Sequence, residues 1–265
     1  MKAEFKAKFG AKLGAKSVAM RGTLGALAAA LTGMAALTGA VVLGPNGSAG
    51  ASEGSRPDPD LPAPAVEMSI SRQPEDPGKA VNLTLDDGPD PTWTPKALEI
   101  LAASGAKATF CMTGPNAQAH PDLVKKVVAA GHRLCNHSVS HDTAMDKKSV
   151  AYQGKEILDA KRMIDEASGG AELRYYRAPG GAFTPQSRQL AAAHGMRSLG
   201  WNVDPGDYRR PGADAILATV ERQLANGPTI LLHDGGGDRS QTMQALQKLL
   251  PRLKEQGYAF SFPQA

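Results

Sequence analysis

Cysteine is scarce in this sequence, since Cys111 and Cys135 are the only two thiols among 265 residues. Closed structural zinc sites commonly hold the ion with several cysteines. A chain whose two cysteines both lie in apolar, strand-like runs does not favour that class of protein. Whether the two form a disulfide stays open, because a disulfide needs Cα atoms within roughly 7 Å. A free buried cysteine would pack equally well as a small apolar side chain.

Basic charge is also scarce once the first 51 residues are set aside. That segment holds six of the 30 lysines and arginines and only one of the 26 acidic residues. The remainder therefore carries 24 basic and 25 acidic side chains, a net charge of −1. Nucleic-acid-binding domains present clustered positive charge, so nucleic acid is not an expected partner.

The N-terminal segment 1–51 has the composition of an export signal. Its lysines precede an apolar run rich in alanine and leucine at 22–43, and Ala49-Gly50-Ala51 fits the small-residue rule for signal peptidase. We expect cleavage after Ala51 and a secreted or cell-envelope protein. The run is nearly as long as the roughly 20 residues that span a bilayer. An uncleaved N-terminal membrane anchor is therefore the competing interpretation, and membrane contact is expected only through this segment.

Residues 52–78 are rich in proline, serine and aspartate and show no hydrophobic period. Such a composition buries little apolar surface, which predicts a linker without stable structure of its own. Residues 79–265 are left as a single folded domain, and the sequence contains no internal repeats.

From Lys79 onward, short β-rich runs alternate with longer amphipathic runs. Repeated strand–helix–strand order brings parallel strands together with helices outside. We therefore predict a single α/β domain with the fold of an irregular (β/α) barrel, with a doubly wound sheet as the alternative. The expected strands are 80–85, 107–112, 132–135, 174–177, 196–201, 228–233 and 258–262, and the expected helices begin near residues 94, 121, 149, 185, 213 and 241.

Polar and charged side chains follow five of the predicted strands. In either fold, functional groups gather at the carboxyl ends of the strands, so the five clusters predict one active site. They are Asp86 with Asp87, His137 with His141, Arg177, Asp204 with Asp207, and His233 with Asp234.

His137 and His141 stand four positions apart, a spacing that lets two imidazoles bind one metal ion. One of the adjacent Asp86 and Asp87 can supply a third ligand, and the charge of the ion then offsets the repulsion between the carboxylates. The other aspartate stays free to act as a base toward water. The competing interpretations are a solvated loop for the histidines and a simple hydrogen-bonded turn at residues 86–90.

Five motifs in order, TLDDGP, HSVSH, RAPGG, DPGDY and LLHDG, resemble those of the polysaccharide deacetylase family, the NodB-homology domain of metal-dependent carbohydrate esterases. The resemblance spans about residues 79–262. It implies a hydrolase that removes N-acetyl groups from a polysaccharide or oligosaccharide of N-acetylglucosamine, of the peptidoglycan or chitin type.

The same resemblance implies a role for individual residues. Asp86 would be the catalytic base, and Arg177 would pair with it and keep it ionised. His233 would be the catalytic acid, and Asp207 would orient it and raise its pKa. The cofactor would be a divalent metal, usually zinc, with cobalt possible. The remaining assignments are the metal ligands Asp87, His137 and His141, the oxyanion-binding backbone N–H of Gly180, and the acetyl-pocket residues Tyr208 and Leu231.

Three positions depart from the family pattern. Leu85 stands where phenylalanine is common, Gly180 where an aromatic residue is common, and Tyr208 where tryptophan is usual. The first affects packing, and the other two affect the sugar groove rather than the chemistry. Each polar catalytic position is present, so an active enzyme is expected.

The glycine-rich stretch 235–242 lacks the lysine and the spacing of a phosphate-binding loop. A flexible loop at the rim of the site is expected there instead. Of the two tryptophans, Trp201 is expected in the core, whereas core packing and sugar stacking are equally open for Trp93.

Two rival functions remain. An O-acetyl esterase acting on acetylxylan would use the same water chemistry, and the sequence does not separate it from an N-deacetylase. A carbohydrate-binding protein without turnover is the rival of another class. The intact set of Asp86, Arg177 and His233 argues against it, because binding alone needs no acid and base. An acetylated polysaccharide is the expected partner, and a monomer is expected.

Overall fold

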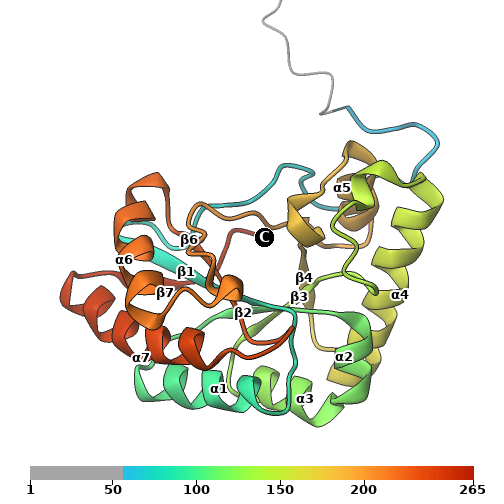
Figure 1. Cartoon of the computed structure of the whole chain (residues 1–265). Coiled ribbons are helices and arrows are strands. Elements are labelled where there is room, and N and C mark those ends of the chain that lie inside the picture. Colours follow the sequence, from blue (N-terminus) through green and yellow to red (C-terminus); the bar gives the residue numbers. More distant parts are fainter. Residues whose placement is uncertain (1–55) are drawn as a thin grey trace, which may run out of the picture. The chain divides into compact units, whose positions relative to one another are not determined.

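The computed structural model describes residues 56–265, so the signal segment predicted at 1–51 lies outside the described part of the chain. Strands and helices alternate along this part (Figure 1). The strands are β1 (Ala80–Asp86), β2 (Thr109–Met112), β3 (Arg133–Asn136), β4 (Leu173–Tyr176), β5 (Arg197–Ser198), β6 (Thr229–His233) and β7 (Ala259–Ser261).

The helices form an outer layer around these strands (Figure 1). They are α1 (Trp93–Ala103), α2 (Gly114–Ala119), α3 (Pro121–Ala129), α4 (Val150–Ser168), α5 (Pro185–Ala193), α6 (Ala213–Gln223) and α7 (Ser240–Glu255). Short 3-10 helices are η2 (Met145–Lys147), η3 (Pro179–Gly181), η4 (Asp207–Arg209) and η5 (Leu224–Asn226). Neighbouring helices pack in the pairs α1 with α7, α6 with α7, and α4 with both α2 and α3.

The strands form one parallel sheet in the order β5-β4-β3-β2-β1-β6, with β7 beside the first residues of β1. The chain that follows β5 closes this sheet. Leu199 donates its backbone N–H to Tyr176 of β4, and Val203 forms a parallel bridge with Ile230 of β6. The segment 199–203 thus crosses from one edge strand to the other. The predicted irregular (β/α) barrel is confirmed, and the sheet is not the open, doubly wound alternative.

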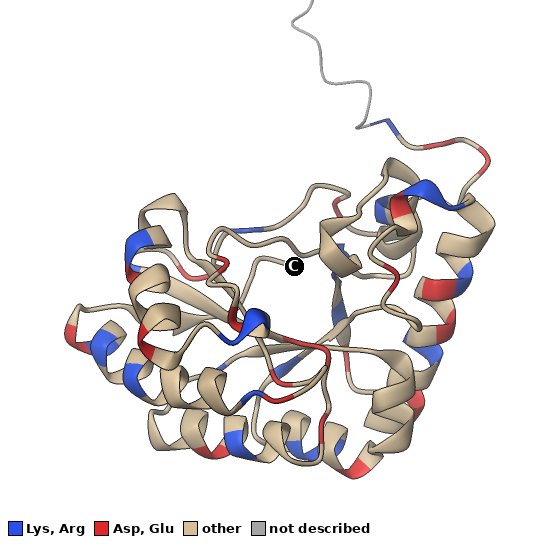
Figure 2. Ribbon diagram, viewed as in Figure 1, with Lys and Arg blue, Asp and Glu red and all other residues tan. Residues whose placement is uncertain are grey.

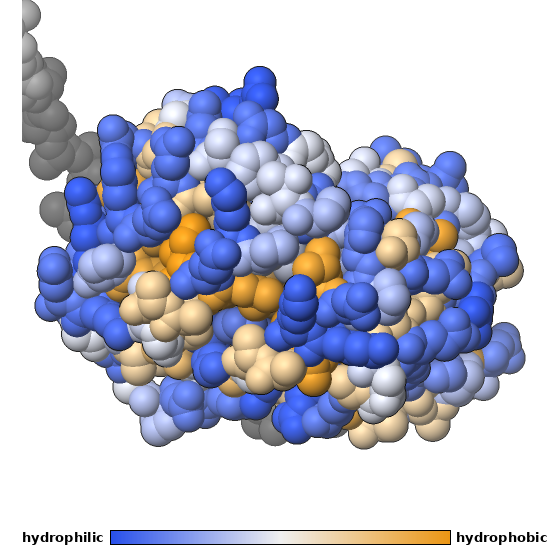
Figure 3. Space-filling view, turned by 90° about the horizontal axis from the view of Figure 1, so that it is seen from below, coloured by the Kyte–Doolittle hydropathy of each residue, from blue (hydrophilic) through white to orange (hydrophobic). Residues whose placement is uncertain are grey.

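The core fills the space between the strands and the surrounding helices. Every residue of β1 is buried, as expected for a parallel strand that is covered on both faces. Acidic and basic residues both occur along the outer helices, as the ribbon colours of Figure 2 show. On the face shown in Figure 3, hydrophilic side chains predominate and apolar ones appear in interrupted patches. The long helices are amphipathic, because α4 and α7 bury apolar residues on one side, such as Ile157 and Ile164 in α4 and Leu246 and Leu250 in α7. Among residues 56–265, no helix has the length and apolar character to cross a membrane.

Residues 56–78 lie against the barrel, which differs from the linker without stable structure that their composition predicts. The carbonyl of Ser71 accepts the backbone N–H of Gly200 at 2.9 Å. Glu75 pairs with Arg133 of β3 at 2.7 Å. These partners lie far away in the sequence, so no local pattern could have revealed them.

Two elements differ from the sequence prediction. Helix α2 forms where the sequence predicts none, and β5 has two residues where a strand over 196–201 is expected. β5 is short because the chain beyond Ser198 leaves β4 for β6. Gly200 lets the crossing chain pass close to residues 56–78. A Cβ atom at position 200 would lie only 2.8 Å from the side chains of Ile70 and Arg72.

The two cysteines face each other across neighbouring strands. Cys111 of β2 and Cys135 of β3 are partners in the strand register and form a disulfide, with Cα atoms 4.1 Å apart. The sequence leaves this pairing open, because the register of two strands is a tertiary property.

Candidate active site

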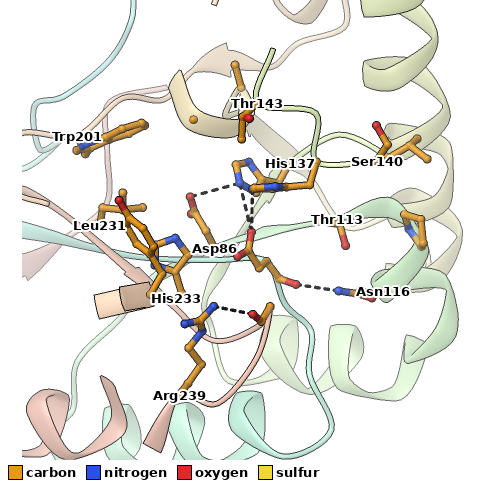
Figure 4. A pocket seen from close by; sticks show the side chains of 18 of the residues that line it. Asp86, Thr113, Asn116, His137, Ser140, Thr143, Trp201, Leu231, His233 and Arg239 are labelled. Carbon is orange, nitrogen blue, oxygen red and sulfur yellow. Dashed lines mark hydrogen bonds and ion pairs between the residues drawn. The ribbon is translucent and has the colours of Figure 1, made fainter. Parts of the chain in front are cut away.

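The side chains assigned to the site meet at the carboxyl ends of the strands, around a cavity of about 760 Å³ (Figure 4). Parallel strands place these ends on one side of the barrel, which is why segments distant in sequence converge there. Arg177 and Asp207 lie buried directly behind the cavity wall. The predicted residues that line it are Asp86, Asp87, His137, His141, Gly180, Tyr208, Leu231 and His233.

A turn at the end of β1 brings two neighbouring carboxylates into the same cavity. Adjacent side chains of a strand point to opposite faces, but Asp87 has a φ of 75°, in the left-handed region. This conformation costs a residue with a side chain roughly 1–3 kcal/mol and needs support from its surroundings. Asn116 of α2 supplies support, because its side-chain amide donates to the carbonyl of Asp87 at 2.8 Å.

Asp87, His137 and His141 form a candidate metal centre. Each offers one ligand atom, and these atoms lie within 4.8 Å of one another. Asp87 Oδ1 lies 3.6 Å from His137 Nε2 and 3.2 Å from His141 Nε2. Although buried, this oxygen has no hydrogen-bond partner in the described part of the chain. It is therefore a donor atom that the protein itself leaves unpaired.

The protonation of His137 explains why a cation fits. Its Nδ1 lies 2.8 Å from the carbonyl oxygen of Arg177, which can only accept, so Nδ1 carries the proton and Nε2 presents a lone pair. Burial lowers the pKa of His137 to about 3, although the charge of Asp87 opposes the change. The lone pair of this neutral imidazole faces oxygens of Asp86 and Asp87 at 3.5 and 3.6 Å.

Lone pairs gathered in this way repel one another unless a positive charge lies between them. Two imidazoles and one carboxylate also leave coordination positions free, as catalytic divalent-metal sites do. The residues therefore fit a divalent cation. The chemistry of the donors does not distinguish zinc from cobalt.

Asp86 is held from behind by Arg177, which is fully buried. The guanidinium Nη1 donates to Asp86 Oδ1 at 2.6 Å and to the hydroxyl of Thr84 at 2.9 Å. Its Nε and Nη2 donate to the carbonyls of Leu199 and Gly200, both at 3.1 Å. Burial raises the pKa of Asp86, and the charges of Arg177 and His233 oppose this rise. The result is a fixed carboxylate whose second oxygen is turned toward His137.

His233, the last residue of β6, is paired with Asp207. The distance from His233 Nδ1 to Asp207 Oδ1 is 2.7 Å. The other oxygen of Asp207 accepts the backbone N–H of His233 and the hydroxyl of Thr242, both at 2.9 Å. Burial lowers the pKa of His233, but the hydrogen bond and charge of Asp207, with the charges of Asp86 and Asp87, outweigh it and raise the pKa to about 9. His233 is therefore protonated at neutral pH.

The wall of the cavity beside His233 is apolar and aromatic. The ring of Tyr208 lies edge-on to the imidazole of His233, with centroids 5.3 Å apart, and Tyr208 is 41% exposed. Leu231 lines the cavity beside it. On the other side, Gly180 has a φ of 60°, and a Cβ atom there would lie 3.2 Å from Thr143. A side chain at position 180 would therefore be strained.

The prediction that Trp201 lies in the core is wrong. Its ring is partly exposed and lines the cavity, 5.5 Å from the guanidinium carbon of Arg177. Trp93 instead packs partly buried at the start of α1, where it contributes to a smaller cavity between α1 and α7. Trp201 is thus the tryptophan that a ligand in the larger cavity would meet.

The two remaining acidic residues of the five clusters, Asp204 and Asp234, lie in different places. Asp204 lines the cavity. Asp234 is buried beside α1, where it accepts the hydroxyl of Thr94 at 2.5 Å. Burial raises the pKa of Asp234 to about 7, and the hydrogen bond from Thr94 opposes this rise. Asp234 is therefore part of the packing behind the site.

One arginine that lines the cavity was not among the site residues predicted from the sequence. Arg239 lies in the stretch that the sequence assigns to a flexible rim loop, yet it is buried and lines the cavity (Figure 4). Its guanidinium donates to the carbonyls of Gly235 and Gly236 at 2.6 and 2.9 Å. The loop is therefore held from inside by its own arginine, a contact that the glycine-rich composition conceals.

Known proteins were compared with this chain. The family model described as polysaccharide deacetylase matches residues 73–199. A peptidoglycan-N-acetylglucosamine deacetylase of Bacillus cereus is 40% identical over 184 residues, which are 69% of this chain and 85% of the relative. The chain belongs to the polysaccharide deacetylase family. The resemblance drawn from the five sequence motifs is thereby confirmed.

Other members of the polysaccharide deacetylase family differ in activity and substrate. A chitooligosaccharide deacetylase of Sinorhizobium fredii is 37% identical over 198 residues, 70% of this chain and 91% of the relative. The crystal structure of a CE4-family pseudoenzyme from Bacillus anthracis has a TM-score of 0.64 at 30% identity, covering 71% of this chain and 64% of that one. Membership of the family therefore does not by itself establish activity, which depends on the residues of the site.

Proposed function

We propose that this protein is a metal-dependent hydrolase that removes N-acetyl groups from a polysaccharide or oligosaccharide of N-acetylglucosamine, of the peptidoglycan or chitin type. One observation carries the proposal. A single cavity combines a three-residue cation site, a carboxylate held by a buried arginine, and an imidazole paired with a buried carboxylate. A binding protein would need neither the second nor the third. Relatives named as peptidoglycan and chitooligosaccharide deacetylases support the choice of bond.

Asp87, His137 and His141 would hold the cation, for which we propose zinc, with cobalt as the alternative. When bound, such an ion supplies Lewis-acid polarisation of the acetyl carbonyl and of a water molecule. Asp86 removes the proton of the attacking water. Its raised pKa brings this base nearer to the working pH, where proton transfer is most effective. Arg177 keeps the carboxylate aimed at the cavity.

His233 completes the reaction from the other side of the scissile C–N bond. The water oxygen forms a bond to the acetyl carbon. His233 gives its proton to the amide nitrogen as the C–N bond breaks. The products are acetate and a free amine on the sugar. The backbone N–H of Gly180 would donate to the oxyanion, a contribution worth about 3–4 kcal/mol in other hydrolases. Tyr208, Leu231 and Trp201 would enclose the acetyl group and the sugar ring.

Acetate release from defined substrates tests this proposal. The full-length chain is loaded with zinc or cobalt and incubated with chitooligosaccharides, peptidoglycan and acetylxylan, and Asp86→Asn serves as the inactive control. We expect acetate together with new free amines from at least one of the first two. Acetate from acetylxylan alone would assign the O-acetyl esterase. Metal binding without acetate from any of the three substrates would contradict the hydrolase and favour the carbohydrate-binding alternative.

The location of the protein is a separate proposal. We infer that residues 1–51 direct export, that cleavage follows Ala51, and that the protein acts as a monomer in the cell envelope or outside the cell. The Cys111–Cys135 disulfide agrees with an oxidising compartment. Mass spectrometry of the mature N-terminus tests the cleavage site, and light scattering tests the monomer. A chain that still starts at Met1 would favour the membrane anchor.

A further inference from the structure

The turn that carries the two histidine ligands rests on α4, and a residue outside the five motifs holds it there. Glu156 is buried in α4 at 7% exposure. Its Oε2 accepts the backbone N–H groups of Val139 and Ser140, at 3.0 and 2.8 Å. Among residues 56–265 this carboxylate has no ion-pair partner. The hydrogen bonds that the carboxylate of Glu156 accepts are those from Val139 and Ser140 of the turn.

The turn needs such support because its backbone is unusual. Ser138 and His141 have φ values of 66° and 55°, both in the left-handed region. A residue with a side chain adopts such a conformation only when its surroundings hold it there. Removal of Glu156 would also leave two consecutive backbone N–H groups, those of Val139 and Ser140, without their acceptor, which destabilises the turn.

The two histidine ligands differ in how they are oriented. The ring of His137 is fixed by its hydrogen bond to the carbonyl of Arg177. Metal-binding histidines usually make such a bond with the nitrogen that does not face the ion. In the described part of the chain, no hydrogen bond holds the second ring nitrogen of His141, whose side chain is 39% exposed. The position of His141 therefore depends on the backbone of the turn.

We propose that Glu156 is a positioning residue of the metal centre. By accepting from Val139 and Ser140, it holds the turn in the conformation that directs His141 toward Asp87 and His137. Its role lies in the hydrogen bonds it accepts rather than in its charge. This inference rests on the proposed function, because it assumes that the three ligands bind a divalent cation.

Three substitutions at one position separate hydrogen bonding from charge. Glu156→Ala removes the acceptor. Glu156→Gln keeps an acceptor oxygen at the same reach and removes the charge. Glu156→Asp keeps the charge and withdraws the acceptor by one methylene. Glu166→Ala, on the same helix but at an exposed pair with Arg162, is the matched control.

Cobalt binding to the full-length, metal-free protein is followed by its visible absorption spectrum, with competition by a chelator to obtain the dissociation constant. We expect Glu156→Ala and Glu156→Asp to bind cobalt roughly 10–100-fold more weakly and with an altered spectrum. Glu156→Gln and Glu166→Ala should keep the spectrum and the cobalt affinity of the wild type, because the first retains an acceptor oxygen for the turn and the second lies at an exposed pair away from it.

Other results are equally informative. A folded Glu156→Ala variant with wild-type cobalt affinity and spectrum would overturn the inference. If that variant does not fold, the other two decide, and binding by Glu156→Asp that equals or exceeds that by Glu156→Gln would overturn the inference. A wild-type chain that binds no cobalt would instead overturn the proposed function.

Discussion

The cavity has a metal half, formed by Asp87, His137 and His141, and a proton-transfer half, formed by Asp86 and His233 with their partners. The two halves differ in whether the chain itself supplies a partner for each polar group. In the proton-transfer half, each ionisable group has a partner within the chain. Asp86 is paired with Arg177 at 2.6 Å, and His233 is paired with Asp207 at 2.7 Å. In the metal half, Asp87 Oδ1 is buried without a hydrogen-bond partner in residues 56–265, and it faces two imidazoles.

The difference shows that the fold itself supplies the partners of the acid and the base, whereas the metal half requires a cation from outside the chain. Buried charges are stable when they are paired and hydrogen-bonded, so the acid and the base are held in place by folding alone. The metal half instead collects lone pairs, and a cation would turn their repulsion into attraction. We therefore expect substitutions in the metal half to lower the metal content of the protein. Substitutions in the proton-transfer half should lower turnover while the metal stays bound.

The largest effect is expected from His137→Ala. The substitution removes one ligand, so metal content should fall from about one ion per chain, as in a three-ligand catalytic site, to near zero. Acetate release should fall to background with it. Elemental analysis of the purified protein measures the first effect. His194→Ala, an exposed histidine after α5, is the control. Metal content equal to that of the wild type would remove His137 from the ligand set.

Asp86→Asn should give the complementary result. The amide keeps the shape of the side chain but cannot take up a proton, so kcat should fall by roughly 10²–10⁴-fold, the usual share of general base catalysis. Bound metal should remain at the wild-type level. Asp159→Asn, a half-buried position in α4 that pairs with Lys155 and does not line the cavity, controls for the change of charge. Activity near that of the wild type would show that another group acts as the base.

Asp207→Asn should shift the pH dependence. His233 acts when protonated, and Asp207 is the main group that raises its pKa, to about 9. Without that charge the pKa falls, so the imidazolium is lost at lower pH. The alkaline limb of the profile of kcat/KM should therefore move toward neutral pH, while the acid limb stays. Rates measured from pH 5 to pH 10.5 test this, and an unmoved alkaline limb would contradict the role of the pair.

The smallest effect is expected at the wall of the cavity. Tyr208→Ala removes the ring that lies edge-on to His233. An aromatic contact of this kind is worth about 0.5–1.5 kcal/mol, which corresponds to a roughly 2–10-fold loss in kcat/KM. Tyr208→Phe keeps the ring and should behave like the wild type. An equal loss in both variants would mean that the hydroxyl, rather than the ring, contacts the substrate.

Much of the fold follows from local patterns. Apolar runs and capping residues predict the six longer helices, and every strand except the short β5, to within a few residues. Helix α2 is not predicted, because its six residues Gly114–Ala119 include Gly and Pro and show no clear apolar period. The short length of β5 is not predicted either, because its end is decided by the crossing from β4 to β6. Residues 56–78 likewise gain their structure only from partners elsewhere in the chain.

The order of the elements follows from hydrophobic spacing along the chain, and the ten proposed site residues follow from the five motifs through their resemblance to the polysaccharide deacetylase family. Tertiary structure alone decided the closure of the barrel, the Cys111–Cys135 disulfide and the burial of Arg239. It also placed Glu156 behind the histidine turn. These features depend on strand register and on left-handed backbone positions, which arise only when segments distant in sequence pack together.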